Sequence, residues 1–75
     1  MYGDTDVMRK QAGRLREQGG EIRAMADQLV AQAEAVTWAG RAGDAMRERV
    51  RERATRLREA ADDHDTAADS LETHL

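Results

Sequence analysis

The chain has 75 residues, enough for one small domain. Aromatic residues make up 3%, proline, phenylalanine and cysteine are absent, and the formal net charge is −3. The absence of cysteine excludes a disulfide-stabilised fold and a thiolate metal site. No apolar run is long enough for a membrane span, and the negative net charge disfavours nucleic-acid binding. The high content of Ala, Arg, Glu, Gln and Leu is typical of an all-helical protein.

Large apolar residues are scarce. Hydrophobic residues make up 40% of the chain, but 14 of them are alanine. So small an apolar surface offsets little of the conformational entropy that folding removes, and there is no cysteine to staple the fold. We therefore expect the chain to associate with itself or with a partner chain.

The first half of the chain carries a heptad seam. From Met8 to Val36, apolar or small residues recur at alternating spacings of four and three positions. This pattern predicts one helix over about 4–36, with Asp4 or Thr5 as its N-cap. The seam continues in phase through two adjacent glycines, so we expect no break there. Large residues occupy the d positions (Met8, Leu15, Ile22, Leu29, Val36), and small ones occupy the a positions (Ala12, Gly19, Ala26, Ala33).

A second seam runs from Val50 to Leu75 and predicts a helix over about 43–73. The two seams are out of phase across residues 37–45, and we place the turn at residues 37–43. Gly40 or Gly43 is a candidate for the left-handed cap conformation, and Thr37 or Asp44 for a helix N-cap. The second seam again alternates large d residues (Val50, Leu57, His64, Leu71) with small a residues (Ala54, Ala61, Ala68).

A short turn forces the two helices to run antiparallel. If they pair with residue numbers summing to 83, each layer joins a small residue to a large one. Gly19 then faces His64, the one polar residue of the seam, and every other layer is apolar. The predicted fold is therefore an all-α, antiparallel, coiled-coil-like hairpin that forms a single domain over residues 1–75 and dimerises into a four-helix bundle.

Charge supports the antiparallel arrangement. Residues 1–16 sum to +2 and residues 17–36 to −3, whereas residues 41–58 sum to +4 and residues 59–75 to −6. Folding back at the turn sets +2 beside −6 and −3 beside +4. A parallel arrangement would place like charges together instead.

The two edges of the seam differ in charge. The e positions of both helices, here named the e edge, are nearly all charged: Arg9, Arg16, Arg23, Val30, Arg51, Arg58, Asp65 and Glu72. The g positions, here named the g edge, hold one charge: Gln11, Gln18, Met25, Gln32, Met46, Arg53, Ala60 and Ala67. Interface cores are depleted of charge and enriched in methionine. We therefore predict that a second hairpin docks on the g edge around Met25 and Met46; the alternative is a low-charge solvated stripe.

Other candidate sites have plainer interpretations. The arginine-rich stretch over residues 47–58 is interleaved with glutamates and lacks aromatic residues for base stacking, so it predicts a solvated or partner-facing surface. The acidic stretch around His64 and His74 has no pair of histidines at ligand spacing. We expect no enzyme activity, cofactor or metal. His64 either fills the space beside Gly19 or forms a pH-sensitive layer, because its protonation would put a charge in the seam.

The only tryptophan lies in the predicted turn, as Trp38-Ala39-Gly40, between two helices of similar length. An apolar residue, Val36, precedes it by two positions, and Gly43 to Met46 follow with a Gly-x-x-Met helix entry. Over its whole length the chain resembles the WXG family of type VII secretion substrates, early-secreted-antigen-like helical hairpins found chiefly in actinobacteria and firmicutes. Trp38 and Gly40 match the turn residues of that family.

The resemblance implies homodimers or heterodimers with a paralogous hairpin, and export from the cytoplasm by a membrane ATPase machine without a cleavable signal peptide. Partners would include a paralogue, a toxin or the secretion ATPase, with no direct membrane insertion and no nucleic acid. The family's Tyr-x-x-x-Asp/Glu export motif follows the second helix, whereas here Tyr2 and Asp6 have that spacing before or within the first. Either a partner supplies the export signal or the chain is a targeting domain. The alternative is a coiled-coil interaction module unrelated to secretion.

Overall fold

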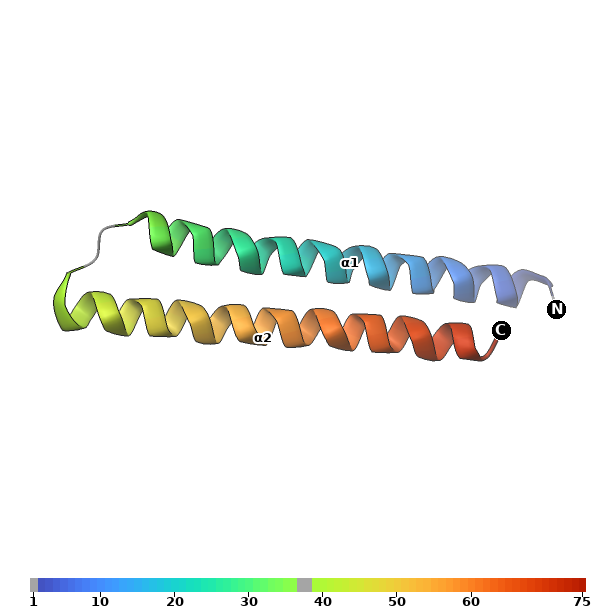
Figure 1. Cartoon of the computed structure of the whole chain (residues 1–75). Coiled ribbons are helices and arrows are strands. Elements are labelled where there is room, and N and C mark those ends of the chain that lie inside the picture. The colour runs from blue at the N-terminus through green and yellow to red at the C-terminus, as the bar shows by residue number, and fades with distance from the viewer. Residues whose placement is uncertain (1, 37–38) are drawn as a thin grey trace.

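A computed structural model describes residues 2–36 and 39–75 and contains two long helices, α1 (Tyr2–Ala35) and α2 (Gly40–Thr73). The helices lie side by side and run in opposite directions, so that both chain ends lie at the same end of the molecule (Figure 1). The predicted all-α architecture of two packed helices is confirmed, and no strand occurs in the described ranges. Thr37 and Trp38 lie outside the described residues, so the Trp-Ala-Gly turn stays a prediction.

The helix ends differ from those expected. Because α1 already begins at Tyr2, Asp4 and Thr5 lie within the helix rather than at its N-cap. Helix α2 begins at Gly40 rather than near Gly43, and its N-cap is Ala39, in an extended conformation without a side-chain capping bond. Asp44 therefore also lies inside a helix, where its carboxylate pairs with Arg47 at 3.2 Å.

The sequence predicted a left-handed backbone conformation at Gly40 or Gly43. The structure has it at Gly40, with a φ of 70°. Gly40 adopts that conformation at the start of α2 and not as the C-cap of α1. A side chain would be disfavoured there by about 1–2 kcal/mol because the Cβ approaches the following carbonyl oxygen. The other candidate, Gly43, continues α2 and is buried.

The hairpin is long and thin. Its principal extents are 61 × 15 × 10 Å and its radius of gyration is 17.4 Å, against about 11 Å for a compact domain of this length. Each helix has one neighbour, so only small residues are enclosed. Among the described residues no large side chain is fully buried, and those of the d positions stay partly exposed. The hydrophobic core consists of five alanines at 0% exposure: Ala12, Ala26, Ala54, Ala61 and Ala68.

The two helices lie close together at Gly19, which the continuous helix α1 carries against α2. A Cβ at this position would lie 3.6 Å from the Cβ of His64 and 3.2 Å from the backbone oxygen of Ala61. The predicted pairing of Gly19 with His64 is therefore found in the structure. The adjacent Gly20 faces open space.

Candidate partner-binding groove on the g edge

The e edge is closed by ion pairs between the helices. Arg16 contacts Asp69 at 2.7 Å and also pairs with Glu72, while Arg23 contacts both Asp62 and Asp65 at 2.7 Å. Farther along the same edge, Arg58 contacts Asp27 at 3.0 Å. Each arginine occupies an e position, and its acidic partners occupy e or b positions of the other helix. The predicted e edge therefore acts within the hairpin, joining α1 to α2.

These contacts keep the arginines charged. The hydrogen bond to Glu72 is the largest cause that raises the pKa of the Arg16 guanidinium, and the hydrogen bond to Asp65 does the same for the pKa of Arg23. A raised pKa in the folded state means that the stabilisation is fully present at neutral pH. It is lost only as the pH rises through that raised pKa. The side chains are 40–41% exposed, so water and salt screen the pairs.

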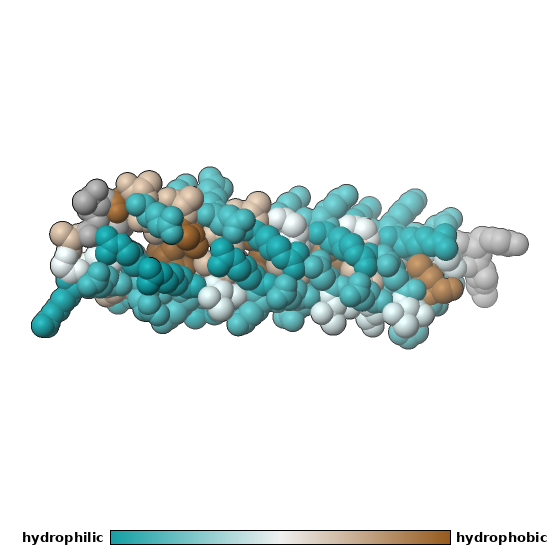
Figure 2. Space-filling model, viewed as in Figure 1, coloured by the Kyte–Doolittle hydropathy of each residue, from teal (hydrophilic) through white to brown (hydrophobic). Residues whose placement is uncertain are grey.

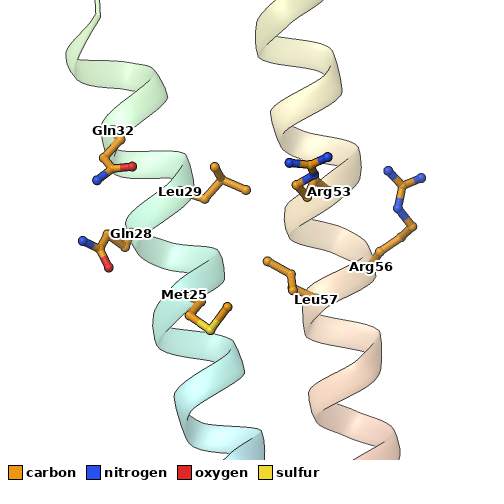
Figure 3. A pocket seen from close by; sticks show the side chains of 7 residues that line it. All are labelled: Met25, Gln28, Leu29, Gln32, Arg53, Arg56 and Leu57. Carbon is orange, nitrogen blue, oxygen red and sulfur yellow. The ribbon is translucent and has the colours of Figure 1, made fainter.

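The g edge carries an open groove with a volume of about 590 Å³. Leu29 of α1 and Leu57 of α2 point toward each other across it, with Met25 alongside (Figure 3). Met25 is 55% exposed, which is high for a large apolar side chain. The remaining lining is polar and comes from both helices: Gln28, Gln32, Arg53 and Arg56.

A second hollow of about 280 Å³ shares Leu29, Arg53 and Arg56 with the groove and extends it toward the connection. This hollow adds two apolar residues of α2, Met46 and Val50, to the lining. It also adds two charged residues, Arg49 and Glu52. The e edge at the same level holds a hollow of only about 30 Å³, beside Val30. In Figure 2 the surface is mostly hydrophilic, and hydrophobic patches show between the helices toward the connection.

The structure brings together three of the six residues predicted for the interface. Met25 and Gln32 line the groove and Met46 lines its extension. The other three lie farther along the same edge, outside both hollows: Gln18, Ala60 and Ala67.

Sequence reasoning on g positions alone missed the rest of the groove. Its floor comes from d residues, Leu29 and Leu57, and its outer rim from c residues, Gln28 and Arg56. The c positions stand next to g around a helix, so the heptad pattern contained a signal for the rim. The partial exposure of Leu29 and Leu57 in the groove could not be predicted from the heptad pattern, because a closely packed seam would have covered both residues.

His64 is half-buried on α2, and its Nδ1–H donates to the backbone oxygen of Ala60 at 2.8 Å. Because a carbonyl oxygen can only accept, Nδ1 is the donor in this bond. The ring lies beside Gly19, as the sequence predicted. Its pH sensitivity stays a prediction, to be checked by comparing thermal unfolding of native and His64→Leu chains at neutral and mildly acid pH.

Residues 2–36 and 39–75 contain no group of three or more His, Asp or Glu side chains placed to hold a metal ion. Neither α1 nor α2 has a stretch long and apolar enough to cross a membrane. Compared with known proteins, the chain matches no family model, no curated protein and no solved structure.

Proposed function

We propose that this chain is a small type VII secretion-associated protein that acts by helix-bundle protein–protein interaction. A second helical hairpin, either a paralogue or another copy, covers the groove on the g edge and completes a four-helix bundle. In this role the chain is a substrate, an export partner or a targeting domain. It is made in the cytoplasm and leaves the cell without a cleavable signal peptide, together with a toxin or through contact with a secretion ATPase.

The observation that carries the interaction role is the exposed apolar groove. Half-buried leucines form its floor and an exposed methionine its side, while the enclosed core of the hairpin consists of alanine. Covering apolar surface contributes roughly 25 cal/mol per Å². A partner on this edge would bury the large side chains that two helices alone leave half open, and that burial supplies the stability that an alanine core lacks.

The secretion role is supported by the form of the hairpin. Two helices of 34 residues each flank a short connection, and the sequence Trp38-Ala39-Gly40 runs from that connection into the first residue of α2. Gly40 has the left-handed backbone that a glycine at this point supplies. The second candidate function is a coiled-coil interaction module with no link to secretion, and the heptad seam with its ion-paired e edge suits that function equally well.

Light scattering of the chain, alone and with helical proteins encoded by neighbouring genes, tests the interaction role. Met25→Glu places a charge in the groove, and we expect it to lower the affinity for the partner by at least about tenfold. Arg9→Glu on the e edge is the control, since it changes the charge without touching the groove. Arg16→Glu is unsuitable because Arg16 holds the two helices together.

An intact complex with Met25→Glu, or one dissociated by Arg9→Glu, would contradict the face assignment. The secretion role is tested separately, in the producing bacterium. We expect the protein in the culture medium of the parent strain and its loss from the medium when the secretion ATPase is deleted. Equal amounts in both media favour the unrelated interaction module.

A further inference from the structure

The groove has one charged wall and one neutral wall. Arg49, Arg53 and Arg56 stand at c and g positions along one side of α2, here named the arginine wall, and all three line the hollow that extends the groove. The opposite wall, on α1, is formed by Gln28 and Gln32. The groove therefore presents an apolar floor with positive charge along one side only.

The arginine wall has no ion pair of its own. None of its three guanidinium groups pairs with a carboxylate of the described residues, although Glu52 lines the same hollow. By contrast, the e-edge arginines Arg16, Arg23 and Arg58 each contact a carboxylate of the other helix. Carboxylates thus pair with the arginines of the e edge, whereas the arginines beside the groove form no ion pair among the described residues.

We infer that the groove binds a partner helix whose apolar stripe is flanked on one side by carboxylates. This rests on the proposed function and specifies its partner. Leucine-sized side chains of the partner would fill the space over Leu29 and Leu57, and its Asp or Glu residues would pair with Arg53 and Arg56. Arginine recognises carboxylates with paired, directional hydrogen bonds, so these contacts select an acidic partner over a neutral or basic one.

A second copy of the chain fits this groove poorly in either direction. If two hairpins stack g edge to g edge with their connections at the same end, two-fold symmetry sets the arginine wall of each against Gln28 and Gln32 of the other, which offer no carboxylate. If the connections lie at opposite ends, the groove faces the far part of the g edge. That part carries a carboxylate at the c position of Asp63, but its g residues Gln18, Ala60 and Ala67 are polar or too small to fill an apolar groove. The groove chemistry therefore favours a different chain.

The probe is a labelled synthetic helical peptide of four heptads, with leucines along one stripe and glutamates on the flanking positions. Matched peptides carry lysine or glutamine in place of glutamate. Fluorescence anisotropy, below the concentration at which each peptide self-associates, measures binding to the full chain. We expect the glutamate peptide to bind at least about tenfold more tightly than the lysine peptide, with a preference that shrinks as salt increases.

Two variants locate the preference. The double substitution Arg53→Glu and Arg56→Glu reverses the charge of the wall and is expected to favour the lysine peptide. Lys10→Glu with Arg9→Glu makes the same change of charge away from the groove and is expected to leave the order unchanged. Circular dichroism confirms that both variants keep their helices, so that altered binding is not mistaken for unfolding.

Equal binding of the glutamate and lysine peptides, or a glutamate preference that survives in the Arg53→Glu, Arg56→Glu chain, would overturn the inference. If Met25→Glu still abolishes that charge-independent binding, the groove remains a docking site and the proposed interaction role stands. Sedimentation of the chain alone as a dimer that Met25→Glu dissociates would overturn the inference in favour of a second copy. Failure of all peptides to bind overturns it as well, and the light-scattering complex then tests the proposed function independently.

Discussion

The half of the hairpin near the chain ends is built differently from the half near the connection. In the terminal half (residues 2–24 and 58–75), Gly19 brings the helices together and Arg16 and Arg23 join them. In the connection half (residues 25–36 and 39–57), Ala26 and Ala54 are enclosed between the helices, but hollows lie along both edges. One seam pattern thus gives a closed half and an open half.

The difference follows from the residues of the a layers and their neighbours. In the terminal half Gly19 lets the two backbones approach, beside the ion pairs of Arg16 and Arg23. In the connection half the acidic residues are fewer and arginine dominates α2, so little closes the edges. Stability is therefore concentrated in the terminal half and the surface for binding in the connection half. Substitutions that act on one half only should separate these two properties.

The largest expected effect comes from placing a side chain in the close contact at Gly19. Gly19→Leu would force a side chain against the backbone oxygen of Ala61, which a Cβ alone would approach to 3.2 Å. Because a backbone group cannot move aside as a side chain does, we expect a loss of about 2 kcal/mol in the free energy of unfolding. Urea unfolding followed by circular dichroism measures it. An unchanged midpoint would mean that the terminal half is not closely packed.

The neighbouring glycine gives the opposite prediction. A Cβ at Gly20 meets no atom within 4 Å, so alanine adds only its helix propensity. We expect Gly20→Ala to raise the free energy of unfolding by about 1 kcal/mol, through a less flexible unfolded chain. The same urea unfolding experiment checks it. Destabilisation by both substitutions would indicate that α1 needs two glycines for flexibility rather than one for packing.

The sequence predicted this register because heptad spacing fixes which residues of two antiparallel helices meet, as it did for Gly19 and His64. It failed at the helix ends, where Ala39 is the N-cap of α2 without any side-chain bond. Such an end depends on the backbone angles of the connection rather than on a capping residue. The depth of the groove could not be predicted either, because it depends on the side-chain orientations of Leu29 and Leu57, which the heptad pattern does not specify. Trp38 lies outside the described residues.

The smallest expected effect is a change in the unfolding midpoint that distinguishes the ion-paired arginines of the e edge from those of the arginine wall. Arg23→Glu would place a carboxylate beside Asp62 and Asp65, whose oxygens now lie 2.7 Å from the guanidinium. We expect a lower midpoint of thermal unfolding in low salt, because an attraction across the e edge becomes a repulsion. High salt should reduce the difference, since both partners are partly exposed and the interaction is screened.

Arg53→Glu is the matched control for this change, with the same substitution and the same change in net charge. Arg53 lines the groove and pairs with no carboxylate among residues 2–36 and 39–75. Its loss should therefore leave the unfolding midpoint of the isolated hairpin nearly unchanged while weakening the binding of an acidic helix. If both variants lowered the midpoint equally, net charge would govern stability, and the division into a closed half and an open half would not hold energetically.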